Sequence, residues 1–224
     1  MWVRSCDGAS DAEWTEPMAL NPTRTTEDDI CLIVALKGGV GFVWTDQQAD
    51  AVCFRWHDDS AAPESWGPVE FVDLSGKTAD DHLNAAVARD GTLFLVTKNE
   101  SDRVGSPQLT LRRRHPDGSW DNLPYENRTK KAIPSRPIAL VGGAPEQLFL
   151  IHSAYPQPVK NRYSIICRKM STDELELDAT ACELFGSGRR VNDATGCKRT
   201  LPEGQEWIVL ASDLDGNVFE AILP

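Results

Sequence analysis

The stretch VGFVWTDQ at residues 40–47 is an apolar run that ends in polar residues, and the chain repeats this pattern three more times. The later copies are LFLVTKNE at 93–100, LFLIHSAY at 148–155 and WIVLASDL at 207–214, so successive copies start 53, 55 and 59 residues apart. Apolar, β-branched and aromatic residues in short runs are typical of strands. Strand-like repeats at about this period predict the blades of a β-propeller.

Each copy lies within a group of four expected strands. One strand candidate precedes it across a turn such as Gly38-Gly39, a third follows it, and a fourth begins near a tryptophan, Trp66 or Trp120. The predicted fold is therefore all-β, a propeller of four-stranded antiparallel blades. We expect a single domain, 1–224, made of a partial blade at 1–26, blades at about 27–77, 78–133 and 134–188, and a C-terminal partial blade at 189–224.

The two ends of this array do not match each other. The first 26 residues read as a third and a fourth strand, whereas the chain stops after a third strand. Four to five blades are thus at least partly present. Either the chain is an incomplete part of a larger ring, or its overhanging strands pair to close a small one. We favour the incomplete ring, because propellers contain about four to eight blades and an unpaired edge strand is a liability.

The composition limits the classes of function. Hydrophobic residues make up 41% of the 224 residues and charged residues 25%, as in ordinary globular proteins. The net charge of −11 opposes binding to phosphate backbones, so nucleic acid is not an expected partner.

No apolar run approaches the roughly 20 residues that span a bilayer, and we expect no membrane insertion. The start of the chain has no signal-peptide core. The location is therefore undefined by the sequence, and extracellular or cell-surface if the chain is part of a longer protein.

The six cysteines, at 6, 31, 53, 167, 182 and 197, form no CxxC pair and have no histidine at zinc-finger spacing. We therefore predict no metal site and no cofactor. Cys31, Cys53, Cys167 and Cys197 lie in strand-like runs. The favoured interpretation is that they are free, buried thiols, with disulfides as the alternative.

Polar residues recur where the first and second strands of a blade meet. In an antiparallel blade, the start of the first strand and the end of the second lie at the same edge. Asp29, Asp81, Arg136 and Asn192 are spaced 52, 55 and 56 residues apart, and we expect them at equivalent places around the mouth of a central channel. The remaining ligand-binding candidates at this edge are His82, Asp193, Gln47, Lys98 and His152.

A polar funnel of mixed charge suits a hydroxyl-rich or anionic ligand. Arginine offers a planar fork to a carboxylate, while acids and amides can satisfy sugar hydroxyls. The predicted partner is therefore carbohydrate. The alternative is that these are ordinary turn residues, since Asp, Asn and Ser are favoured wherever strands end. Arg136 and His82 fit that alternative least well.

Catalysis at this edge is left open. Asp29, Asp81 and Asp193 could supply the two carboxyl groups of a glycoside hydrolase. Alternatively, His82 or His152 could act as the base of a polysaccharide lyase, with Arg136 or Lys98 neutralising the substrate carboxylate. The sequence contains no GxSxG motif and no phosphate-binding glycine loop.

Five segments in order resemble sialidase-like (BNR-type) propeller domains of secreted or surface multi-domain proteins. They read GFVWTDQ at 41–47, ADDHLN at 79–84, SRPI at 135–138, NDAT at 192–195 and VLASD at 209–213. The resemblance covers nearly the whole chain from about residue 15. It implies a propeller with further strands before this point, and a relationship to the neuraminidase superfamily.

That superfamily implies an arginine triad for the substrate carboxylate, a tyrosine and glutamate nucleophile pair, and an aspartate acid. Only Arg136 is similar to one arginine of the triad, since Asp29, Asp81 and Asn192 stand at the other equivalent places. The Asp-box, S-x-D-x-G-x-x-W, is partly matched by HPDGSW at 115–120. The resemblance thus implies the fold more strongly than the activity.

The predicted function is a carbohydrate-binding, surface-associated propeller. A glycoside hydrolase or a polysaccharide lyase is the first alternative, so whether the protein is an enzyme stays open. The second alternative is a protein-docking propeller, which an exposed apolar patch would reveal.

Overall fold

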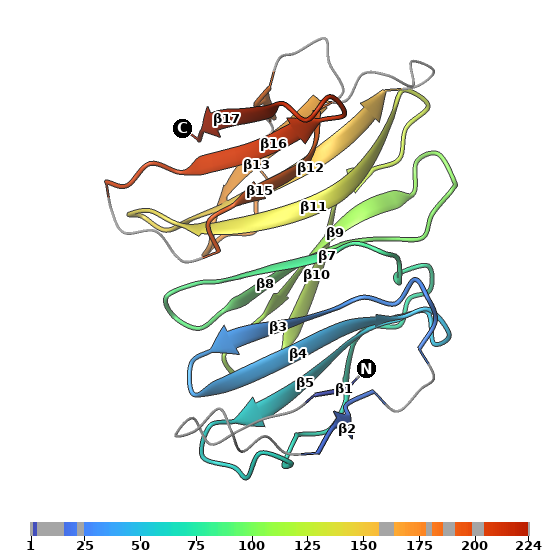
Figure 1. The fold of residues 1–224 in the computed structure, drawn as a ribbon, viewed down its shortest axis with the longest axis vertical. Coiled ribbons are helices and arrows are strands. Elements are labelled where there is room, and N and C mark those ends of the chain that lie inside the picture. Colours follow the sequence, from blue (N-terminus) through green and yellow to red (C-terminus); the bar gives the residue numbers. More distant parts are fainter. Residues whose placement is uncertain are drawn as a thin grey trace. The chain divides into compact units, whose positions relative to one another are not determined.

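The computed structural model describes residues 2–3, 16–21, 25–156, 164–177, 181–185, 191–198 and 204–223. All regular structure in these ranges is β-structure, and they contain no helix that could cross a membrane. The strands form three four-stranded sheets, one three-stranded sheet and one two-stranded pair (Figure 1). The prediction of an all-β fold built from four-stranded antiparallel sheets is confirmed.

The chain divides into two compact units, Met1–Asp81 and His82–Pro224. The first unit contains a short antiparallel pair and one complete sheet of order β3-β4-β5-β6. Its strands are β1 (Trp2–Val3), β2 (Met18–Ala19), β3 (Cys31–Leu36), β4 (Gly39–Asp46), β5 (Ala51–Asp58) and β6 (Glu70–Asp73).

The core of the first unit is built on the repeat VGFVWTDQ. Its apolar residues form β4, where Phe42 and Trp44 are buried and pack with Cys53 of β5 and with Leu20. Burying these large side chains contributes roughly 1.5–3 kcal/mol each, which explains why this repeat occupies a central strand of the sheet.

The second unit contains three sheets, of orders β7-β8-β9-β10, β11-β12-β13-β14 and β15-β16-β17. Their strands are β7 (Leu83–Val87), β8 (Leu93–Lys98), β9 (Pro107–Arg114), β10 (Trp120–Asn127), β11 (Ala132–Gly142), β12 (Gln147–Pro156), β13 (Ser164–Ser171), β14 (Cys182–Glu183), β15 (Val191–Gly196), β16 (Ile208–Asp213) and β17 (Val218–Ile222).

Alternation along β12 explains how these three sheets pack. Leu148 and Leu150 point to one face and join a core cluster with Phe94 of β8. Phe149 and Ile151 point to the other face and join a cluster with Val209 of β16. Successive side chains of a strand point to opposite faces, so the near-continuous apolar run LFLI marks a sheet that is covered on both sides.

The strand order within each sheet is that of a propeller blade, but no sheet of the described residues joins β17 to β1 or β2. Ring closure is therefore not seen in this part of the chain. The chain divides into two compact units, and whether these form the predicted single domain stays a prediction.

Two local predictions are corrected. The fourth strand of the first complete sheet begins at Glu70 rather than at Trp66, which forms an isolated bridge to His57 instead. Cys31 and Cys197 are exposed rather than buried. The five described cysteines are all free, and only Cys53 and Cys167 are buried.

Candidate functional site

Two β-bulges occur at matching places in neighbouring sheets of the second unit. In β11, the pairing with β12 shifts between Ser135 and Ile138, and in β15 the pairing with β16 shifts between Asn192 and Thr195. Each shift inserts one extra residue, so Arg136 and Asp193 occupy equivalent positions. The predicted equivalence of Arg136 with Asn192 is therefore off by one residue.

Both bulge residues have a left-handed backbone conformation. Arg136 has φ of 52° and Asp193 has φ of 55°. This region costs roughly 1–2 kcal/mol for a residue with a side chain, less for aspartate because its short side chain can bond locally. Bulges re-aim side chains near functional sites, and these two direct an arginine and a carboxylate toward each other.

The two residues belong to a hydrogen-bonded group that we name the Arg136 cluster: Arg136, Ser153, Tyr155, Asn192 and Asp193. Arg136 Nη1 lies 2.8 Å from Asp193 Oδ1, and its Nε donates to Tyr155 Oη at 2.8 Å. Tyr155 Oη and Ser153 Oγ both donate to Asn192 Oδ1, at 3.2 and 2.8 Å. The cluster thus links β11, β12 and β15.

The cluster is open to solvent on its charged side. The Arg136 side chain is 41% exposed and that of Asp193 is 58% exposed, whereas Ser153 is fully buried beneath them. One positive and one negative charge cancel. The result is a polar surface without net charge, on which guanidinium donors and carboxylate acceptors lie side by side.

The neighbouring sheet of the second unit places two other candidates together. The amide of Lys98, at the end of β8, donates to the carbonyl of His82, just before β7, at 3.1 Å. The expectation that the start of a first strand and the end of a second lie at the same edge holds here.

The first unit repeats that arrangement. The Asp29 carboxylate accepts hydrogen bonds from the backbone amides of Thr26 and Gln47, at 2.7 and 2.8 Å. These contacts fit the turn-forming alternative for Asp29. Asp81 is exposed at the end of this unit. The ring of Asp29, Asp81, Arg136 and Asn192 spans both units and stays a prediction.

His152 lies in the interior of the second unit. It is 2% exposed and packs with its ring centroid 6.2 Å from that of Tyr125. Burial, with a smaller contribution from the positive charge of Arg168, lowers the pKa of His152 to about 3. The residue is therefore neutral and shielded from solvent, so its ring is not accessible to a ligand at the surface.

Tyr155 and Ser153 were not among the predicted ligand-binding candidates, although both lie in the polar part of the repeat LFLIHSAY. Their signal lies in the alternation of LFLIHSAY, because Ser153 and Tyr155 share a face with Phe149 and Ile151, which is turned toward β16 and β15. Polar residues that continue an apolar face past the core indicate a site at its edge.

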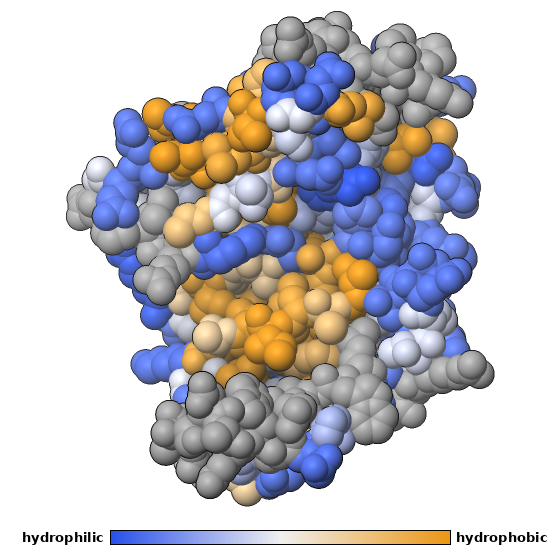
Figure 2. Space-filling view, in the orientation of Figure 1, coloured by the Kyte–Doolittle hydropathy of each residue, from blue (hydrophilic) through white to orange (hydrophobic). Residues whose placement is uncertain are grey.

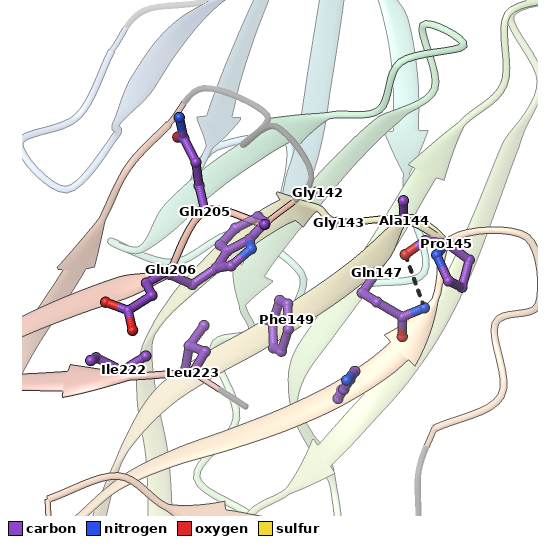
Figure 3. A pocket seen from close by; sticks show the side chains of 13 residues that line it. Gly142, Gly143, Ala144, Pro145, Gln147, Phe149, Gln205, Glu206, Ile222 and Leu223 are labelled. Carbon is purple, nitrogen blue, oxygen red and sulfur yellow. Dashed lines mark hydrogen bonds between the residues drawn. The ribbon is translucent and has the colours of Figure 1, made fainter.

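A hollow lies at the opposite end of β11 from the Arg136 cluster, where the β11–β12 hairpin faces the residues before β16 (Figure 3). It has a volume of about 610 Å³, and Phe149, Trp207 and Leu223 form its apolar wall. The rings of Phe149 and Trp207 are 5.2 Å apart and both are buried, so neither presents an open face for stacking. This hollow contains none of the predicted ligand-binding candidates.

No family model matches the chain, and no curated protein matches it. Among solved structures, it is similar to a chain described as a bifunctional GH43-CE protein of Bacteroides eggerthii, with a TM-score of 0.45 and 13% sequence identity. The likeness covers 87% of this chain and 24% of that one, so the chain spans about a quarter of its length. A likeness at this score carries no inference about activity.

Proposed function

We propose that the second unit binds a neutral, hydroxyl-rich carbohydrate at the Arg136 cluster. The observation that carries this proposal is the ion pair between Arg136 and Asp193, which presents donors and acceptors within a few ångströms on an exposed surface. Sugar hydroxyls both donate and accept, so a paired guanidinium and carboxylate complement them.

The same ion pair favours a neutral sugar over an acidic one. A ligand carboxylate would have to compete with Asp193 for the Arg136 guanidinium, and it would lie close to the carboxylate that it displaces. A hydroxyl group needs no such displacement, because it can bond to the pair as it stands.

Binding has more support than hydrolysis. Glycoside hydrolases use two carboxyl groups about 5–10 Å apart across the scissile bond. The Arg136 cluster contains one carboxylate, that of Asp193. The hydrolase and lyase alternatives therefore have less support from the geometry of this cluster.

The test is a screen of the purified protein on an array of neutral and acidic glycans. We expect retention on neutral glycans and its loss in Asp193→Asn, which removes the carboxylate charge but keeps a residue that tolerates the left-handed backbone. The control is Arg89→Ala, which breaks a partly exposed pair between Arg89, after β7, and Glu146, in the β11–β12 hairpin at the opposite end of β11 from Arg136. Equal retention by all three proteins, or retention confined to acidic glycans, would refute the proposal.

A further inference from the structure

The sheet β15-β16-β17 of the second unit has one covered face and one open face. Val209 and Ala211 of β16 are buried against the sheet β11–β14. The alternate residues of β16, Ile208 and Leu210, are 44% and 38% exposed. On β17, Ile222 lies opposite Ile208 and is 52% exposed. Val218, also on β17, is 69% exposed. Figure 2 shows apolar side chains gathered over β16 and β17.

The outer edge of β17 has no partner strand among the described residues. In the other three large sheets, the third strand pairs with a fourth: β5 with β6, β9 with β10, and β13 with β14. Within the part of the chain that the structure describes, the sheet β15-β16-β17 has three strands. An open strand edge of this kind is a template for pairing with another strand.

The hydrogen-bond pattern identifies the edge groups. Leu223 donates to the Trp207 carbonyl at 2.8 Å, and Asp213 donates to the Asn217 carbonyl at 3.0 Å, so odd-numbered residues of β17 pair with β16. In an antiparallel ladder, hydrogen-bonded and non-bonded residues alternate. Val218, Glu220 and Ile222 therefore direct their N–H and C=O groups to the outer edge, and their side chains lie on the open face.

The charge at this edge restricts which strand fits. Glu220 lies between Val218 and Ile222, opposite Leu210 of β16. Where the third and fourth strands pair in the sheet β7–β10, Arg113 of β9 faces Asp121 of β10 in an ion pair of 2.6 Å. Opposite charges across strands stabilise pairing and like charges oppose it. A second copy of β17 centred on this site would place Glu220 against Glu220.

We propose that the outer edge of β17 is a docking site for an extended strand of another protein, with an apolar-x-Lys/Arg-x-apolar pattern. The partner's backbone bonds to Val218, Glu220 and Ile222, its basic residue faces Glu220, and its apolar residues extend the exposed face. The inference is independent of the carbohydrate site, since it rests on different strands.

The probe is a ten-residue peptide with the core Val-Thr-Lys-Thr-Val, compared with a matched peptide with the core Val-Thr-Glu-Thr-Val. Amide hydrogen exchange is measured residue by residue by NMR. At about 90% occupancy by the lysine peptide, exchange at Val218, Glu220 and Ile222 slows about tenfold, because only the unbound tenth exchanges. Exchange at Phe219 and Ala221, whose amides already bond to β16, does not change.

Two variants and a control complete the experiment. Ile222→Pro removes one edge N–H without touching the β16 ladder, and we expect it to weaken lysine-peptide binding at least tenfold, since proline is tolerated at an edge. Glu220→Lys, which keeps the backbone, should reverse the preference to the glutamate peptide. Leu214→Ser, an exposed apolar residue in the turn after β16, should bind as the wild type does.

Three results would overturn the proposal. Equal binding of both peptides would show that Glu220 sets no specificity. Protection of the three edge amides that rises with protein concentration, without peptide, would identify a second copy as the occupant. Protection at high dilution without peptide would show that a segment of the same chain covers the edge.

Discussion

Arg136 and Asp193 occupy equivalent bulge positions in neighbouring sheets, and their side chains meet in an ion pair of 2.8 Å. Both residues hold left-handed backbone conformations, with φ of 52° and 55°. The left-handed backbone at each bulge therefore goes together with a surface contact, in which the Arg136 guanidinium meets the Asp193 carboxylate. Positions of this kind are over-represented near functional sites.

The backbone strain at Asp193 can be measured separately from its charge. Asp193→Gly and Asp193→Ala both remove the ion pair with Arg136, but only alanine retains a Cβ in the left-handed region. We expect the free energy of unfolding of the alanine variant to be about 1 kcal/mol lower than that of the glycine variant. Urea denaturation of the two proteins measures this difference, and equal stabilities would show that the bulge relaxes.

The burial of His152 predicts a loss of stability in acid. Its pKa is lowered to about 3 in the folded protein, while the unfolded chain binds this proton near pH 6.5. Between these values the unfolded state binds more protons, so the free energy of unfolding falls as the pH decreases, by up to about 1.4 kcal/mol per pH unit from this residue.

The variant His152→Phe isolates that contribution, because an aromatic ring keeps the contact with Tyr125 but cannot bind a proton. As the pH falls from 6.5 toward 4, the wild type should lose stability relative to the variant. The unfolding free energy of the wild type minus that of the variant should therefore decrease. A difference that is independent of pH would show that His152 binds its proton as readily in the folded protein as in the unfolded chain, which would contradict its lowered pKa.

The repeats that carry the core could be predicted from the sequence, and the site geometry only in part. VGFVWTDQ became β4 because long apolar runs with β-branched and aromatic residues have few other stable arrangements. Its period also indicated blades. The bulges at Arg136 and Asp193 left no comparable signal, since an extra residue in a strand changes pairing without changing composition.

The alternation of side chains along the strand predicts that His152 is buried, whereas its position near the strand end favoured the interpretation as a catalytic base. His152 follows Leu148 and Leu150 at even spacing, which places it on the face that packs against β8. A histidine near the end of a strand, however, is more conspicuous as a catalytic base. Its neighbour Ser153 points to the opposite face, where its hydroxyl donates a hydrogen bond to Asn192.

Substitutions at the two adjacent glycines of the β3–β4 hairpin, Gly38 and Gly39, should differ in their effect on the free energy of unfolding. A Cβ at Gly39 would overlap the carbonyl oxygen of His57 and the ring of Trp56, whereas Gly38, with φ of 79°, has no atom within 4 Å of such a Cβ. We expect Gly39→Ala to lower the free energy of unfolding by about 1–3 kcal/mol through overpacking. Gly38→Asn, which suits a left-handed turn, should change it by less than about 1 kcal/mol. Thermal denaturation of both variants tests this contrast, and similar losses would contradict the close approach of β5 to Gly39.

The free cysteines should differ in their reactivity toward an alkylating reagent. Burial, reinforced by the negative charges of Asp46 and Asp29, raises the pKa of Cys53 to about 12, and burial raises that of Cys167 to about 12 as well. The thiolate is the reactive form, so both side chains combine poor access with a very small reactive fraction at neutral pH.

The exposed thiols of Cys182 and Cys197 should therefore be modified first, and Cys53 and Cys167 only when the protein is unfolded in denaturant. Peptide mapping by mass spectrometry assigns the modified positions. Modification of Cys167 in the native protein at the rate of its register partner Cys182 would contradict its placement in the core cluster with Ile151 and Val209.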